Sequence, residues 1–203
     1  MVPISPSDFE ALNRYLADRE AEFDQIPEDR KAELNAIADF VRTVDRNARL
    51  AGEAGDAKLT FICTHNSRRS HLCQVWAQVA AHFVGIDSLV TTYSGGTETT
   101  AFYASAVNAL RRAGLDVQPV EVGANTKYAV TYAEGRGPLV CFSKKYNDAT
   151  VNPTTGYAAV MTCGNADRAC PLVRGLRNNR QILLQNRSKS SKVASKSQIF
   201  CEN

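Results

Sequence analysis

The feature that most constrains the fold is a strand–loop–helix pattern between residues 59 and 84. Apolar and β-branched residues at 59–62 run directly into Cys63, and a helical pattern begins at Ser70. Its apolar residues recur at helical spacing, at Leu72, Val75, Trp76, Val79, Ala80 and Phe83. A strand that leads straight into a helix is the repeating unit of α/β folds. We therefore expect a strand that ends at Cys63 and a helix over 70–84.

A cysteine at this junction lies where backbone N–H groups and the helix dipole stabilise a thiolate. The same N–H groups can bind a tetrahedral oxyanion. Six positions after Cys63, Arg69 can add a planar fork of donors, and the Ser70 hydroxyl can point back at the sulfur. The junction thus predicts a nucleophilic Cys63 and an anion site formed by Thr64, His65, Asn66, Ser67, Arg68 and Arg69.

Simpler interpretations of these residues stay open at this point. Cys63 can be a core cysteine beside surface arginines, since a short cysteine–arginine spacing also arises by chance. Ser70 can be a helix cap and Asn66 a turn residue. The imidazole of His65 can be a proton donor or a surface side chain.

Strand and helix patterns alternate along the rest of the chain. A strand is expected at 88–93 and a helix at 100–113, and short apolar strand candidates follow at 119–122, 139–142 and 157–161. Alternation of this kind predicts a parallel sheet with helices on both faces and functional loops at the carboxyl ends of its strands. Residues 1–57 are helix-patterned, with an N-cap at Ser5-Pro-Ser-Asp and a break at Ile26-Pro27. We expect these helices to cover a sheet face or to form a dimer surface, with the structural role favoured.

Three separated blocks resemble the low-molecular-weight protein tyrosine phosphatases and the related thioredoxin-coupled arsenate reductases. They are Cys63-x-x-Asn66-x-x-Arg69-Ser70, Tyr93-Ser-Gly-Gly-Thr97 and Ala159-Val-Met-Thr-Cys-Gly-Asn-Ala-Asp-Arg-Ala-Cys-Pro171. The resemblance covers residues 58–173. It implies a doubly wound α/β domain with a parallel sheet flanked by helices, preceded by a helical extension at 1–57 and followed by a divergent tail at 174–203. It also implies that Asn66 holds the loop in an unfavourable backbone conformation.

The resemblance to the reductases further implies a relay of three thiols. Cys63 is the nucleophile, Cys163 the first resolving thiol and Cys170 the second, and thioredoxin or another thiol is the reductant. No cofactor is implied. The seven-residue spacing of Cys163 and Cys170, without nearby histidines, disfavours a zinc pair. Cys73 and Cys141 lie on apolar patterns and are interpreted as inert core residues, and Cys201 has no assigned role.

The chain departs from the family at several places. His65 stands where the family has Gly, and Arg68 stands where many members have a second loop cysteine. The Asp-Pro pair that supplies the family's general acid is missing, and the nearest candidates are Asp148 and Asp167. After residue 173 the chain becomes rich in Arg, Asn, Gln, Lys and Ser, with seven basic residues against one acidic. We interpret this segment as a solvated, poorly ordered tail, and a frameshift that replaced the ancestral terminus is one hypothesis for it.

The composition and the missing Asp-Pro pair restrict the partners, the location and the type of reaction that we expect for this chain. No apolar run is long enough for a membrane helix, and the acidic N-terminus does not resemble a signal peptide, so we expect no membrane partner. The basic tail lacks interleaved aromatic residues, so we expect no nucleic-acid partner either. Six cysteines without dense spacing indicate a reducing, cytoplasmic location. The substrate is then a small oxyanion, with arsenate reduction favoured. Protein tyrosine phosphatase activity and non-catalytic phosphate or oxyanion binding stay open as alternatives.

Overall fold

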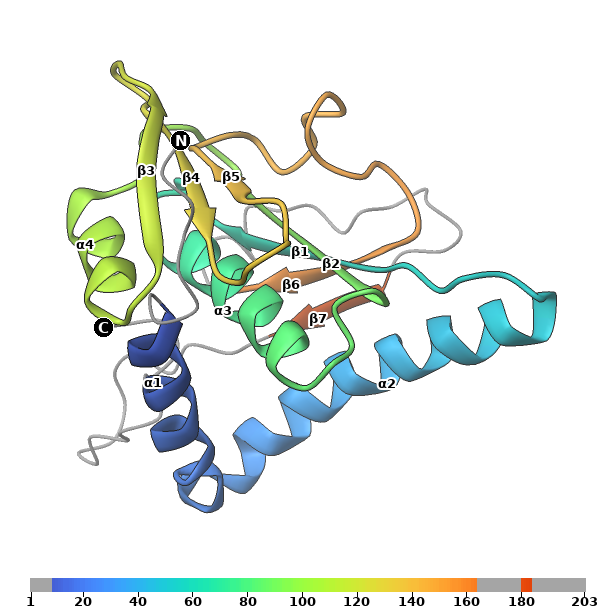
Figure 1. Cartoon of the computed structure of the whole chain (residues 1–203). Coiled ribbons are helices and arrows are strands. Elements are labelled where there is room, and N and C mark those ends of the chain that lie inside the picture. Colours follow the sequence, from blue (N-terminus) through green and yellow to red (C-terminus); the bar gives the residue numbers. More distant parts are fainter. Residues whose placement is uncertain (1–8, 164–179, 184–203) are drawn as a thin grey trace.

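A parallel four-stranded sheet, here called sheet A, forms the centre of the molecule in a computed structural model that describes residues 9–163 and 180–183 (Figure 1). Its strand order is β2–β1–β6–β7. The strands are β1 (Ala57–Cys63), β2 (Val90–Gly96), β6 (Tyr157–Met161) and β7 (Arg180–Leu183). Strand β1 pairs in parallel with β2 along its whole length and with β6 from Lys58 to Ile62. It is buried at every residue except Lys58, as expected for a strand with a neighbour on each side.

The described residues also form four α-helices and one short 3₁₀ helix. They are α1 (Glu10–Glu20), η2 (Phe23–Gln25), α2 (Glu28–Ala51), α3 (Arg69–Phe83) and α4 (Ala104–Arg112). The long helix α2 starts directly after Pro27, whose ring cannot continue a preceding helix but suits a helix start. It ends at Gly52, which adopts the left-handed conformation with φ 73°.

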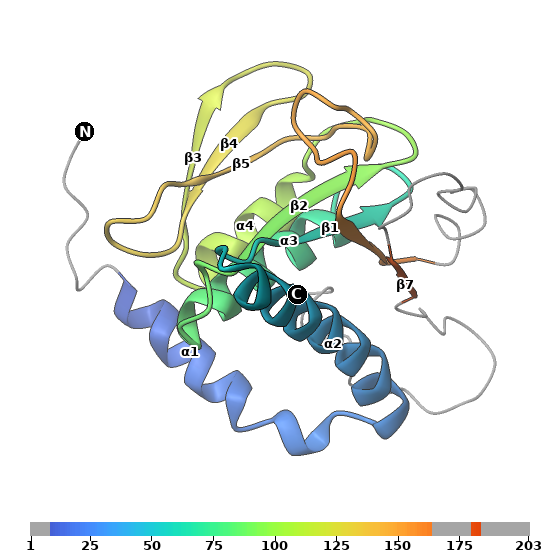
Figure 2. The same ribbon diagram turned by 90° about the vertical axis from the view of Figure 1, so that its right-hand side faces the viewer.

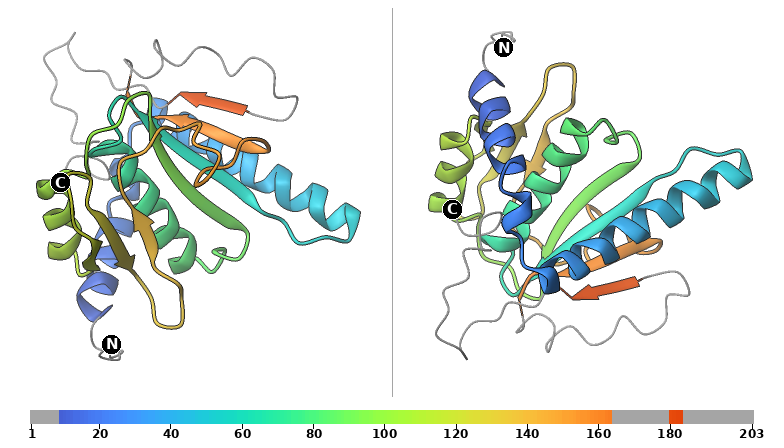
Figure 3. Two further views of the ribbon diagram at one scale, coloured as in Figure 1. Left: turned by 90° about the horizontal axis from the view of Figure 1, so that it is seen from above. Right: turned by 90° about the horizontal axis from the view of Figure 1, so that it is seen from below.

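Helices α2 and α3 pack on the same face of sheet A (Figures 2 and 3). Phe40 of α2 and Cys73 of α3 share one buried cluster with Leu59 and Phe61 of β1 and with Val160 of β6. The opposite face of the same strands presents a second cluster, which consists of Ile62, Cys63, Tyr157, Ala159, Met161 and Cys163. Tyr146, from the segment between β5 and β6, packs against this second cluster. The end of β1 is therefore buried from both sides.

A second, antiparallel sheet, sheet B, lies on the far side of α3 (Figure 1). It consists of β3 (Asp116–Glu121), β4 (Lys127–Thr131) and β5 (Leu139–Cys141), in that order. The largest buried cluster joins α3 to α1, α4 and this sheet, and includes Leu12, Leu16, Val75, Trp76, Val79, Val107, Leu110, Val117, Val130 and Cys141. Helix α3 is thus enclosed between the two sheets, and this fixes the position of its N-terminus.

The structure confirms the α/β class with a parallel sheet flanked by helices, but the described helices that pack on sheet A, α2 and α3, lie on one face rather than on both as expected. Strand β6 coincides with the predicted 157–161, and α3 differs from the predicted 70–84 by one residue at each end. Strands are present at the predicted 119–122 and 139–142, as β3 and β5, but the expectation that they join the parallel sheet was wrong, because they form the antiparallel sheet B; β4 was not predicted at all. The short connections at 122–126 and 132–138 explain the difference, because antiparallel strands can be joined by a short turn whereas parallel strands need a crossover of about a dozen residues or more.

The structure also bears on the predictions for the N-terminal extension and for the tail. The structural role of the N-terminal extension is confirmed, because α1 contributes Leu12 and Leu16 to one core cluster and α2 contributes Phe40 to another. The predicted N-cap at 5–8 lies outside the described residues. The predicted lack of structure in the tail is wrong at Arg180–Leu183, which pairs in parallel with β6. Among the described residues, no helix is long and apolar enough to cross a membrane.

Candidate active site

Cys63 is the last residue of β1, and the loop 64–68 carries the chain from it into α3. The Cys63 side chain is buried, and its Sγ lies 3.1 Å from Ser70 Oγ. Ser70 is fully buried in the first turn of α3, whereas Arg68 occupies the N-cap position without a capping side chain. Ser70 is therefore not the helix cap, and its hydroxyl points at the sulfur as the sequence predicts.

Asn66 holds the loop in shape. Its φ of 43° is the only positive φ of a non-glycine residue in the described part of the chain. Asn66 Nδ2 donates to Ser70 Oγ at 2.8 Å, and Asn66 Oδ1 accepts from the backbone N–H of Lys144 at 2.9 Å. Asn tolerates the left-handed region better than most residues. The predicted unfavourable conformation of Asn66 is confirmed, and its full burial rules out an ordinary surface turn.

The loop leaves a row of backbone donors unused. Within the described residues, none of the backbone N–H groups of 64–71 donates a hydrogen bond, and the first one that does is Leu72, to Arg68 O at 2.9 Å. These groups lie at the positive end of α3, a helix of 15 residues. Backbone N–H groups gathered at a helix N-terminus form an anion-binding site. The loop from Cys63 into α3 therefore has the donors that a tetrahedral oxyanion requires.

The two arginines of the loop have different surroundings. Arg69 is half-buried, and its guanidinium makes no hydrogen bond or ion pair with any described residue, so it is available to an anion. The Arg68 guanidinium instead stacks on the ring of Tyr103, with 3.9 Å from its central carbon to the ring centroid. Ser67 contributes through its backbone, because its carbonyl accepts from Tyr103 N at 2.9 Å. Arg69 is thus the side chain best placed to complete the anion site.

The predicted second block lies beside the loop. The backbone N–H of Thr97 donates to Cys63 O at 3.2 Å, and the hydroxyl of Thr97 donates to Thr64 O at the same distance. The neighbouring Gly96 packs so closely that a Cβ there would lie 2.7 Å from both Asn66 N and Thr64 O. Only glycine allows this approach of the two backbones. The Ser-x-Gly-Thr resemblance therefore corresponds to a direct support of the loop.

Sequence reasoning missed a second support, around Ser143. Its hydroxyl donates to His65 O at 2.8 Å and accepts from the backbone N–H of Thr100 at 2.8 Å. Asn125 fixes the backbone of Ser143 through two hydrogen bonds, of 2.7 and 3.0 Å. The side chain of His65 is exposed, with Nε2 3.4 Å from a carboxylate oxygen of Glu98. His65 thus joins the loop by its backbone, and its imidazole faces the exterior of the site.

Two further buried polar side chains lie behind the loop. His71 is fully buried, its Nε2 lies 3.0 Å from Phe142 O, and its Nδ1 has no partner among the described residues. Burial, together with the nearby Lys144 ammonium, lowers the pKa of His71 to about 3, so its imidazole is neutral at pH 7. Lys144 is itself buried, with Nζ 3.5 Å from Ser94 Oγ. Burial lowers the pKa of Lys144 as well.

Cys163 lies close to the loop. It follows β6, whose last paired residue, Met161, lies opposite Ile62, and it shares the buried cluster that contains Cys63. Cys163 Sγ lies 3.6 Å from Thr64 Oγ1. The structure therefore brings together Cys63 and the first predicted resolving thiol, which are separated by 100 residues in the sequence. The second, Cys170, lies outside the described residues.

The remaining cysteine and metal predictions can be compared with the described residues. Cys141 is fully buried, and burial raises the pKa of its thiol to about 12, which suits an inert core residue. Cys73 is buried in the cluster between α2, α3 and sheet A, but it is disulfide-bonded, so the prediction of an inert core thiol is not confirmed for it. No group of three or more His, Cys, Asp or Glu side chains that could hold a metal ion occurs within residues 9–163 and 180–183.

Asp148 is poorly suited to the role of general acid. Its Oδ1 accepts from both the backbone N–H and the hydroxyl of Thr150, and these hydrogen bonds lower the pKa of the carboxyl group. A general acid at neutral pH requires the opposite shift. Asp148 does line a cavity of about 490 Å³ beside the loop, together with Thr99, Asn125, Phe142, Ser143, Lys144, Lys145 and Asn147. The other candidate, Asp167, lies outside the described residues.

Comparison with solved structures gives distant likenesses only. No protein-family model matches the chain, and no curated protein matches it. Among solved structures, the thioredoxin-dependent arsenate reductase of Corynebacterium glutamicum is similar to it with a TM-score of 0.36 and 18% sequence identity. The match covers 78% of this chain and 61% of that chain, so the chain spans less than two thirds of the length of that reductase.

Proposed function

We propose that this protein is a cytoplasmic cysteine-dependent enzyme that reduces arsenate to arsenite. The observation that carries the proposal is the position of two buried thiols at one oxyanion loop. The eight backbone N–H groups that follow Cys63 have no acceptors among the described residues, and Cys163 lies beside Thr64 of the same loop. The first two sequence blocks that resemble the reductases, and residues 159–163 of the third, lie beside one another at this place. A site that only hydrolysed phosphate esters would not need Cys163.

The proposed reaction starts with the Cys63 thiolate. It attacks arsenic, an As–S bond forms, and one arsenate oxygen leaves as water after taking up protons. The loop N–H groups and Arg69 hold the remaining oxygens and stabilise the charge that develops. The Cys163 thiolate then attacks the Cys63 sulfur. A disulfide forms, the electron pair of the As–S bond passes to arsenic, and arsenic leaves as arsenite, reduced from As(V) to As(III).

The relay then returns Cys63 to its reduced form. The thiolate of Cys170 attacks Cys163, which forms a Cys163–Cys170 disulfide and releases Cys63 as a thiolate. A dithiol such as thioredoxin reduces that disulfide and is itself oxidised. Electrons balance, because arsenic gains two electrons and the dithiol loses two.

The lack of a suitable acid among the described residues favours reduction over hydrolysis. Removing a general acid typically slows a step that needs proton transfer by ~10²–10⁴. This loss is most severe for a poor leaving group such as a tyrosine side chain. One observation nevertheless supports phosphomonoester hydrolysis as a second candidate: the cavity of about 490 Å³ beside the loop can hold an organic group attached to the phosphate. A non-catalytic oxyanion binder is the third candidate, and it needs only the loop.

A paired assay separates these candidates. The purified chain is given arsenate with thioredoxin in one arm and an activated aryl phosphate in the other. For a reductase, Cys63→Ser and Cys163→Ser abolish arsenite production, and Cys141→Ala is the matched control that retains it. For a phosphatase, Cys163→Ser leaves aryl phosphate hydrolysis intact while Cys63→Ser abolishes it. Phosphate binding without turnover in either arm identifies a non-catalytic binder. The phosphatase result and the binder result each contradict the proposal.

A further inference from the structure

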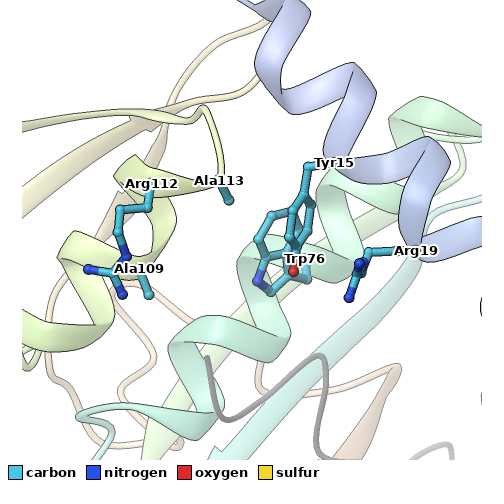
Figure 4. A pocket seen from close by; sticks show the side chains of 6 residues that line it. All are labelled: Tyr15, Arg19, Trp76, Ala109, Arg112 and Ala113. Carbon is cyan, nitrogen blue, oxygen red and sulfur yellow. The ribbon is translucent and has the colours of Figure 1, made fainter.

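A second cavity lies apart from the Cys63 loop, where α1, α3 and α4 meet (Figure 4). Its volume is about 390 Å³, which is within the range of small-molecule sites in proteins. Six residues from these helices and their ends line it: Tyr15, Arg19, Trp76, Ala109, Arg112 and Ala113. Two are aromatic and two are cationic, and none of these lining residues is acidic. None of them belongs to the candidate active site.

Two stacked rings form the apolar part of the cavity. The rings of Tyr15 and Trp76 lie 5.1 Å apart with an angle of 26° between their planes. Trp76 is buried in the core cluster around α3, so the wall it forms is fixed in place. The Arg19 guanidinium lies 5.2 Å from the centre of the Tyr15 ring, beside the stacked pair (Figure 4). A planar apolar group has a matching surface here.

The positive charge of the cavity is only partly neutralised by the described residues. Arg112, from the last turn of α4, forms no ion pair with any of them. Arg19 pairs with Glu22 at 3.0 Å, yet its Nε is buried and has no acceptor in the described chain. Buried donors without an acceptor are rare in proteins. One carboxylate, Glu22, therefore pairs with one of the two guanidinium groups, and within the described residues both Arg19 Nε and Glu22 Oε2 are buried without a hydrogen-bond partner.

We propose that this cavity binds a small organic anion that combines a planar apolar group with a carboxylate or a phosphoryl group. The planar group packs beside Tyr15 and Trp76, and the anionic oxygens bind Arg112 and Arg19. Guanidinium groups bind both anions through paired hydrogen bonds, so carboxylate and phosphoryl ligands share one chemistry. This site goes beyond the proposed reductase function and does not depend on it.

The test uses calorimetric titration of the full chain with benzoate, representing carboxylates, and with phenylphosphonate, representing phosphoryl groups. Trp76 is the only Trp in the sequence, so its single indole N–H signal in a ¹H–¹⁵N spectrum reports on this cavity alone. At least one of the two probes should bind and shift that signal, whereas any binding of phenylphosphonate at the Cys63 loop should leave the signal in place. Benzamide lacks the charge and acetate lacks the ring, so each should bind more weakly, by about tenfold or more.

Variants locate the binding. Arg112→Ala and Arg19→Ala should each weaken the bound probe by about tenfold or more, since each removes a charged hydrogen bond. Arg14→Ala is the matched control on the same helix, because Arg14 pairs with Glu10 and does not line the cavity. The Cys63→Ser variant should bind the probe as tightly as the wild type does. Failure of the chain to reduce arsenate would therefore not affect the outcome of this test. Three results would overturn the proposal. Neither probe binds, or benzamide binds as tightly as benzoate, or the affinity for the probe is unchanged in both Arg112→Ala and Arg19→Ala.

Discussion

Substitution of Asn66 by alanine tests whether the loop is held as described. Alanine must adopt the left-handed backbone of φ 43° without the local hydrogen bonds of Asn. The conformation costs about 1 kcal/mol, the lost bond to Ser70 about 1 kcal/mol, and the unpaired N–H of Lys144 about 1–3 kcal/mol. The free energy of unfolding should therefore fall by about 3–5 kcal/mol, a large part of the about 5–15 kcal/mol that domains possess.

Urea unfolding at pH 7, followed by circular dichroism, measures this change. Asn35→Ala is the matched control, because Asn35 is exposed in α2 and its replacement should alter the free energy of unfolding by less than about 0.7 kcal/mol. Titration with inorganic phosphate adds a second readout, since a distorted loop no longer aligns its N–H groups with the anion. A destabilisation below about 1 kcal/mol, with phosphate affinity unchanged, would refute the role assigned to Asn66.

Three further predictions concern residues around the loop. Gly96→Ala should lower the urea midpoint and weaken phosphate binding, since its Cβ would lie 2.7 Å from Asn66 N; an unchanged midpoint contradicts the close approach. The pKa of His71 falls from 6.5 to about 3 on folding, so the unfolded chain binds more protons between these values. The free energy of unfolding should then decrease as the pH is lowered from 6.5, by up to about 1.4 kcal/mol per pH unit, and His71→Gln should flatten this dependence. Lys144→Met should raise the urea midpoint at pH 7, because it removes a buried ammonium, and a lower midpoint would contradict this.

Local patterns were sufficient to predict the core of the candidate site. The run of apolar residues before Cys63 and the helical spacing after Ser70 are both short-range signals, and β1 and α3 follow them closely. The position of Asn66 in the left-handed region agrees with the resemblance and with the known tolerance of Asn. These features depend on neighbours within a few residues of each other in the sequence, which explains why they were predictable.

The supports of the loop depend on distant residues and could not be predicted in the same way. Lys144 and Ser143 each contact a loop residue that is 78 positions away. No local pattern links such partners, and a lysine in a short loop ordinarily suggests solvent exposure. Strand β4 was missed for a related reason. Its five residues include one buried side chain, Val130, and their pairing with β3 and β5 is decided by tertiary structure.

Mass spectrometry of a trapped intermediate tests the central claim most directly. Cys170→Ser is reduced, freed of reductant, mixed with one equivalent of arsenate and quenched with acid and an alkylating agent. If Cys163 resolves the arsenic adduct of Cys63, the digest contains a peptide with a Cys63–Cys163 disulfide, and one equivalent of arsenite appears. Omission of arsenate, or the further change Cys163→Ser, should abolish both products. Arsenite release without this disulfide, or no reaction at all, would contradict the account.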